Sequence, residues 1–451
     1  MDAPRKTISS SPSIAALAFM LALLGAGSMA YYHLGLFVPR ALQVRASNGL
    51  AGSHSFGNDF YQIWLSSQDW LSQHRDPYSE EETQHIQVGL YGRLLDPHRP
   101  GDPKDRRGFP YPAFAEILFW PTTQFPFPAV RLAVFLSLIG LTAAAVFVWM
   151  RALRWNPGRL WSATIVVLVL GSYPILEGIY AGQVGLLVGF LLAASVLALQ
   201  RGKFLLSGVL IALTTIKPQV SILAILYLLV WSVCDWRRRW AFCAGFFATT
   251  ALLVGGALLI WPHWISTWIH VLLQYHGYTP PPLLGDILRN LFGYVAGPVY
   301  VIATTVLMAA GLVLLWQTRN VPRHSTEFWF TLSLLLALTT IAILPGQAVY
   351  DHGILLPGVF LVSSRWRTLT ANWVLRATLI VGAAVLTWPW IASLAVLMLR
   401  PLLSDKQFYS KPIFALPLHT AAVFPFVVLG LLALARRVAT TSSNPVASLA
   451  G

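Results

Sequence analysis

Runs of about 20 apolar residues, the length needed to cross the hydrocarbon core of a bilayer, recur along most of this chain. Charged residues make up only 11% of the sequence, whereas a soluble globular protein carries about 25%. In lipid only helices or closed barrels satisfy every backbone polar group, and continuous apolar runs favour helices. The sequence therefore predicts an all-α polytopic membrane protein.

The positive charge of the chain is distributed as expected for a membrane protein. The formal net charge is +14, but the arginines and lysines stand in short clusters between apolar runs. Such clusters orient helices in a membrane and do not form a nucleic-acid groove, so we expect no nucleic-acid partner. The two cysteines, Cys234 and Cys243, flank a basic turn that we place in the cytoplasm, and they predict no disulfide framework.

The alternation of basic and uncharged turns predicts about twelve transmembrane helices with both termini inside. The small residues Gly25–Ala30 also allow a cleaved signal peptide, but the apolar run continues well beyond them. We expect five parts: a cytoplasmic N-terminus (1–12), a first transmembrane helix (13–38), an extracytoplasmic loop (39–126), a transmembrane bundle with an outer loop at 262–293 (127–435), and a disordered cytoplasmic tail (436–451).

The long loop is the most polar part of the chain, with ten of its 17 acidic residues. The segment from Asp59 to Leu71 predicts a helix with an apolar face, and Pro112–Pro121 predicts a second, shorter one. We expect both to be interfacial helices on the membrane surface. Further on, Phe204–Ile216 and Gln219–Val233 are short for full spans and predict a helical hairpin bent at Pro218.

Six short motifs resemble glycosyltransferase family 87 in their order along the chain. They are Gly57-Asn-Asp-Phe-Tyr61, Asp76-Pro-Tyr78, Phe109-Pro-Tyr-Pro112, Gly182-Gln183, Arg201-Gly-Lys203 and Ile216-Lys-Pro218. The chain departs from the family pattern in three places, with Pro112-Ala113 for two prolines, Gly182-Gln-Val-Gly185 for Gly-Gln-x-Asn, and Pro280-Pro-Pro-Leu for a later Asn-x-Ser.

The resemblance implies a GT-C-type membrane enzyme. Such an enzyme moves mannose or arabinofuranose from a polyprenyl-phosphate donor to a hydroxyl of a lipid or glycan acceptor. The active site would face the extracytoplasmic side of the inner membrane, in contact with membrane lipids. A single displacement would invert the anomeric centre.

The chemistry requires a base for the acceptor hydroxyl and cations for the departing phosphate. We expect Asp59 to be the general base; the alternative is an acidic residue that only stabilises the first turn of its helix. Lys217 lies between two apolar runs and is the first candidate to bind the donor phosphate, although snorkelling to headgroups explains it equally well. His352 is the second candidate, with Asp351 orienting it, against the alternative of a solvated pair.

Other polar residues on the same predicted side are candidates for substrate binding: Asn58, Tyr61, Tyr111, Glu177, Tyr180, Gln183 and Asp351. His263, His270 and His276 are too widely spaced for a compact metal motif, so we expect no protein-held metal and no cofactor. Some GT-C enzymes use a divalent ion, and one bridging Asp59 and the phosphate is left open.

Two other classes of function were weighed. A polytopic lipid or solute transporter, or a flippase, fits the number of helices, but such proteins often contain internal repeats, and no second large loop appears halfway along this chain. A membrane scaffold without activity leaves the intramembrane charges of Lys217 and Asp351 unexplained.

Overall fold

The architecture is helical, as the apolar pattern predicts. The computed structural model describes residues 11–50, 52, 54–293, 296–346, 348–370 and 373–442. Within these ranges there is no β-strand, and the only β-type pairing is an isolated bridge between Pro282 and Pro345. The all-α class is therefore confirmed.

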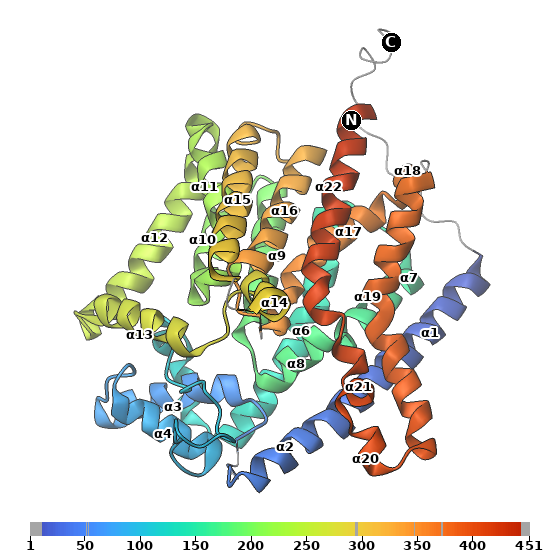
Figure 1. Ribbon diagram of the computed structural model, residues 1–451. Coiled ribbons are helices and arrows are strands. Elements are labelled where there is room, and N and C mark those ends of the chain that lie inside the picture. Colours follow the sequence, from blue (N-terminus) through green and yellow to red (C-terminus); the bar gives the residue numbers. More distant parts are fainter. Residues whose placement is uncertain are drawn as a thin grey trace.

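A single long helical rod forms the N-terminal part of the fold. It runs through α1 (Pro12–Ala30), a π-helical segment (Tyr31–Phe37) and α2 (Val38–Ser47), and it crosses the lower part of Figure 1 in dark blue. The sequence predicted that this helix ends at residue 38, and that prediction was too short. The π-helical segment ends at Phe37, two residues before Pro39. The proline ring would clash with a carbonyl of the preceding turn in a regular α-helix, and the altered hydrogen bonding of the π-helical segment lets the helix continue.

After α2, the long loop folds into a separate helical layer at one end of the bundle, which we call the loop layer (Figure 1). It contains α3 (Asn58–Gln73), α4 (Glu80–Tyr91), α5 (Phe114–Phe119) and a 3₁₀ turn (Trp120–Gln124). The two expected helices are present, whereas α4 was not predicted. Its Ser79 cap accepts a hydrogen bond from the Glu82 N–H, and the following Glu80–Glu82 acids suit a helix N-terminus.

The remainder of the chain forms the bundle and its connections. Its longer helices are α6 (Phe127–Ala152), α7 (Arg159–Leu170), α8 (Tyr173–Ala181), α9 (Val184–Gln200), α10 (Phe204–Leu213), α11 (Pro218–Val233), α12 (Trp236–Ile260), α15 (Ala296–Gln317), α16 (Thr326–Ala342), α17 (Leu356–Ser364), α19 (Trp373–Leu399) and α22 (Phe424–Ser442). The connections carry α13 (Trp264–Tyr278), α14 (Leu283–Phe292), a 3₁₀ segment (Val349–Leu355), α18 (Trp366–Leu369), α20 (Asp405–Phe408) and α21 (Lys411–Phe414).

The protein is a multi-pass membrane protein, but twelve crossings are not confirmed. Among the described residues, six helices are long and apolar enough to span a bilayer, and the pair α7–α8, bent by 60°, would make a seventh. Five further apolar helices have only 10–17 residues, among them the two arms of the expected hairpin, which meet at Lys217 and Pro218. Side chains such as Leu252 (75% exposed) and Leu259 (88% exposed) show that the long helices turn apolar surface outward.

The outer loop packs on the loop layer and thereby fixes it to the bundle. The indole N–H of Trp268 in α13 donates to the Pro110 carbonyl at 3.0 Å, and the rings of Trp261 and Trp70 lie 4.9 Å apart.

The C-terminal helix α22 reaches Ser442, so the start of the tail expected to be disordered is helical; residues 443–451, like residues 1–10, lie outside the described ranges.

Candidate active site

A cavity of about 970 Å³, lined by both polar and apolar side chains, lies where the loop layer meets the bundle. Its wall combines the end of α2, the start of α3, residues 103–111, the end of α8, the α10–α11 junction, α13 and the 3₁₀ segment before α17. The volume lies within the range of small-ligand sites. Most of the residues singled out from the sequence line this cavity: Asn58, Asp59, Tyr111, Glu177, Tyr180, Gln183, Lys217 and Asp351.

Two glycines bring the first and second halves of the site together. Gly57 precedes α3 with φ of +76°, and its N–H donates to the Tyr180 carbonyl at 2.9 Å. Gly182 ends α8 with φ of +72°, and a Cβ there would lie 3.0 Å from Phe60 Cβ. Because both positions need a left-handed backbone and close approach, the motifs that contain them place Asp59 beside Gln183.

Asp59 presents a carboxylate with both oxygens engaged. Arg107 Nη1 donates to Oδ1 at 2.7 Å, and the Gln183 side-chain amide donates to Oδ2. The Asp59 residue is 8% exposed and lies on the cavity wall. It is thus an ionisable group, held in one orientation by a cation and an amide, on the wall of a cavity. Those are properties of a general base.

Lys217 is the centre of a second, buried group of contacts. Its Nζ donates to both oxygens of Asp351, at 2.9 and 2.8 Å, and to Gln183 Oε1 at 2.9 Å, and it lies 4.8 Å from the centre of the Tyr350 ring. Gln183 therefore links the two acids, since its amide contacts Asp59 through nitrogen and Lys217 through oxygen.

Gly185 is the position at which the chain departs from the family's asparagine. A Cβ at Gly185 would lie 2.0 Å from Asp351 Oδ1 and 3.3 Å from Lys217 Nζ. The space that a side chain would fill is taken by the Asp351 carboxylate. The glycine that replaces the family's asparagine thus leaves room for the buried Lys217–Asp351 pair.

Two groups from the loop layer set the local electrostatics. Burial acts to lower the pKa of Arg107, but Asp59, Tyr91 and Asp105 together raise it well above its usual value, so the guanidinium is charged. Arg107 also has φ of +56°, a backbone conformation that costs about 1 kcal/mol and is common at functional sites. Burial, with Asp59 and Asp351 nearby, raises the pKa of Tyr111 well above its usual value, so its hydroxyl stays protonated and can donate.

The structure does not bring Tyr61 or His352 to this cavity. Tyr61 is buried in the loop layer, where its ring stacks on His54 at 4.4 Å and packs against Phe127. His352 is buried beneath a different, mainly apolar cavity of about 750 Å³, between α7, α17, α19 and α22. The neighbouring Asp351 turns to Lys217, so the expectation that Asp351 orients His352 is wrong.

Sequence reasoning missed Arg107, Arg45 and Tyr350, all of which line the cavity. Arg107 stands in a run of loop charges with no helical pattern, so only the folded loop reveals that it reaches Asp59. Arg45 belongs to the helical extension beyond residue 38, and a longer first helix would have placed it on the same side as Asp59. Tyr350 adjoins Asp351 in the sequence, and the intramembrane charge of Asp351 was the signal that could have pointed to Tyr350.

Comparison with known proteins gives one match. The sequence model of glycosyltransferase family 87 matches residues 109–345, slightly more than half of the chain. No curated protein and no solved structure matches the chain.

Proposed function

The chain belongs to glycosyltransferase family 87, and from this we propose that it transfers a sugar, mannose or arabinofuranose, from a polyprenyl-phosphate donor to a hydroxyl of a lipid or glycan. The reaction would take place in the cavity around Asp59, on the extracytoplasmic side. The observation that carries the proposal is the Asp59 carboxylate, oriented by Arg107 and Gln183 on the wall of a cavity large enough for a sugar and its acceptor.

In this reaction Asp59 accepts the proton of the acceptor hydroxyl while the hydroxyl oxygen attacks the anomeric carbon. The bond between that carbon and the phosphate oxygen breaks, and polyprenyl phosphate leaves with the bonding electrons. One displacement inverts the anomeric configuration. Arg107 holds the carboxylate through Oδ1, and Gln183 holds it through Oδ2. Asn58, Tyr111, Glu177 and Tyr180 offer hydrogen-bonding groups for the sugar.

The leaving phosphate needs cations that are not already neutralised. Lys217 is paired with Asp351, which argues against it as the main phosphate ligand. Arg45 and Lys104 also line the cavity, and neither forms an ion pair with another described residue. We therefore assign the phosphate to Arg45 and Lys104, and to Lys217 the positioning of Gln183. A divalent ion held by Asp59 would be the alternative source of charge, and it would be revealed if turnover lost in EDTA returned on addition of Mg²⁺ without Zn²⁺.

The test is turnover by the purified protein. A panel of polyprenyl-phosphate sugars is supplied with membrane-lipid extract as acceptor, and release of polyprenyl phosphate is measured. We expect release with one donor and transfer of its sugar to the extract. Movement of lipid or solute across liposomes without any sugar transfer would contradict the proposal and support a transporter, which the family match does not favour.

A further inference from the structure

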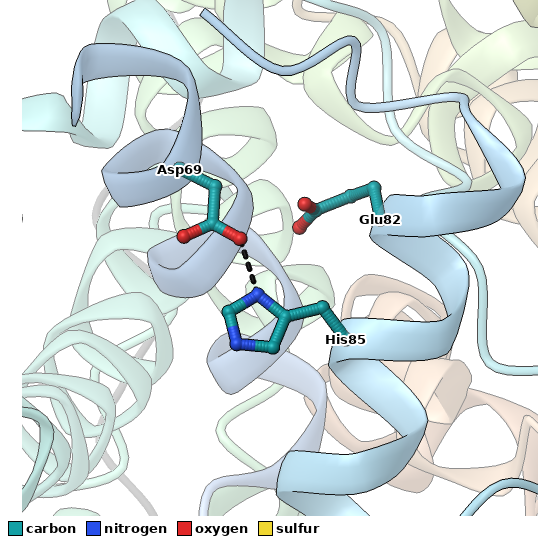
Figure 2. Close-up of side chains that lie close together, drawn as sticks. All are labelled: Asp69, Glu82 and His85. Carbon is teal, nitrogen blue, oxygen red and sulfur yellow. Dashed lines mark hydrogen bonds and ion pairs between the residues drawn. The ribbon is translucent and has the colours of Figure 1, made fainter. Parts of the chain in front are cut away.

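Three side chains of the loop layer converge on one point outside the active-site cavity (Figure 2). Asp69 comes from α3, and Glu82 and His85 come from α4. One carboxylate oxygen or ring nitrogen of each lies within 4.8 Å of those of the other two. The carboxylates of Asp69 and Glu82 are buried, whereas the His85 side chain is 43% exposed and opens the point to solvent.

A nitrogen of Arg75 occupies this point. Its Nη1 lies 2.7 Å from Asp69 Oδ2, 3.0 Å from His85 Nδ1 and 3.5 Å from Glu82 Oε2. His85 Nδ1 also contacts Asp69 Oδ2. A ring nitrogen carries either a hydrogen or a lone pair, so Nδ1 cannot donate to Asp69 and accept from Arg75 at the same time. With Arg75 in place, only one of these two contacts can be a hydrogen bond.

Glu82 provides a second, independent sign of a binding site. Its residue is 0% exposed, Oε1 accepts a hydrogen bond from Ser66 at 2.7 Å, and Oε2 has no hydrogen-bond partner within the described part of the chain. In Figure 2 this carboxylate points toward Asp69 and His85. A buried oxygen without a donor is costly, and a cation that accepts lone pairs from all three groups would remove that cost.

We propose that Asp69, Glu82 and His85 bind a divalent transition-metal ion, with Zn²⁺ the best match, and that Arg75 fills the place of the metal when it is absent. One imidazole nitrogen and two carboxylates form a three-ligand set that Zn²⁺ completes with water. Glu82 and His85 stand three residues apart, a spacing that puts both on one helix face and recurs in metal-binding helices. Ser66 holds the Glu82 carboxylate from behind, as supporting groups of metal sites do.

Arg75 has other hydrogen-bond and ion-pair partners that it can keep when the ion binds. Its Nη2 contacts Gln73 Oε1 at 2.6 Å and lies 3.3 Å from Glu81, whose side chain is 74% exposed. The guanidinium can keep these surface partners while Nη1 leaves the three ligands. The ion would join α3 to α4, and because none of its ligands lines the active-site cavity, its role would be to stabilise the loop layer.

The experiment measures zinc binding directly. The full-length protein, free of any histidine tag and stripped with EDTA, is titrated with ZnCl₂ by calorimetry, and its melting temperature is recorded with and without the ion; MnCl₂ is titrated in parallel. The variants are His85→Gln, Asp69→Asn and Arg75→Gln. The control is His98→Gln, which removes an exposed histidine elsewhere in the same loop.

The proposal requires one Zn²⁺ per wild-type chain and a raised melting temperature, with both effects retained in His98→Gln and lost in His85→Gln and Asp69→Asn. Because Arg75 competes with the ion, Arg75→Gln should bind Zn²⁺ at least about tenfold more tightly. Binding that is unchanged by His85→Gln would overturn the proposal, as would absence of binding in both the wild type and Arg75→Gln.

Discussion

Gly185 and Lys217 show how single residues determine the geometry of the site. The glycine leaves room for the Asp351 carboxylate, and the lysine compensates its charge. A buried charge pair of this kind contributes little net stability, but removal of one partner is strongly destabilising. Both positions can therefore be tested by changes that alter only one group.

Gly185→Ala should lower transferase turnover about tenfold or more. The new Cβ would lie 2.0 Å from Asp351 Oδ1, so Asp351 must move and Lys217 loses its hold on Gln183. Gly189→Ala on the same helix is the matched control, because a Cβ there meets nothing within 4 Å. Equal activity of the two variants in the polyprenyl phosphate release assay would show that the position of Asp351 is irrelevant to catalysis.

Lys217→Met should destabilise the protein by about 3–5 kcal/mol, since Asp351 is left charged and buried. The double variant Lys217→Met/Asp351→Asn should recover much of that loss, because no unpaired charge remains. Melting temperatures of the wild type, both single variants and the double variant measure the effect. If the double variant is as unstable as Lys217→Met, the charge pair is not the cause.

At the level of elements, the contact between α3 and α4 holds the helix that carries Asp59. Figure 2 shows their acidic side chains facing each other. Burial raises the pKa of Glu82 to about 7, and Asp69 adds to this rise, while Ser66 and Arg75 oppose it. The carboxyl is thus half protonated near neutral pH in the folded state, whereas its usual pKa is 4.5.

A pH dependence follows from this raised pKa. The folded protein binds the proton of Glu82 more tightly than the unfolded chain does. The contribution of Glu82 to stability is therefore greatest below about pH 4.5 and is lost as the pH rises to about 7. Glu82→Gln does not titrate and should therefore show a smaller fall in melting temperature between pH 5 and pH 7, measured in EDTA. A fall identical to that of the wild type would assign it to other groups, such as the buried Glu116, whose pKa burial also raises.

The sequence predicts some elements better than others, for physical reasons. Apolar runs and capping signals predict α3, α5 and the two helices on either side of Lys217. The extension of the first helix through Pro39 was not predictable, since proline usually ends or kinks a helix and the π-helical segment that accommodates it has no sequence signature. α4 was missed although Ser79 and three following acids form a recognisable helix start.

The site was predicted to the extent that its residues belong to motifs. Asp59, Gln183, Lys217 and Asp351 were named, and the structure joins them in one network. Their pairing was not predictable, because it depends on contacts between residues 34 to 134 positions apart in the sequence. For the same reason Arg107 was missed, and His352 was assigned to a cavity that it does not line.

At the scale of the whole molecule, the orientation in the membrane is open to a direct test. Cys234 is exposed in the basic turn that we place in the cytoplasm, whereas Cys243 is buried. In sealed right-side-out vesicles a membrane-impermeant maleimide should leave the wild type unlabelled until detergent is added. As a control, Asp96→Cys in a Cys234→Ser background should be labelled without detergent. Labelling of Cys234 from outside would reverse the topology and place the Asp59 cavity on the cytoplasmic side.

The central claim is that Asp59 is the base of a glycosyl transfer, and one comparison tests it most directly. Asp59→Asn is measured beside Asp405→Asn, which alters a carboxylate that is 77% exposed and outside the cavity. Loss of a general base predicts a fall in turnover of about 10²–10⁴-fold per folded molecule for Asp59→Asn, whereas Asp405→Asn should keep the turnover and the melting temperature of the wild type. Turnover of Asp59→Asn within a few-fold of the wild type would contradict the account.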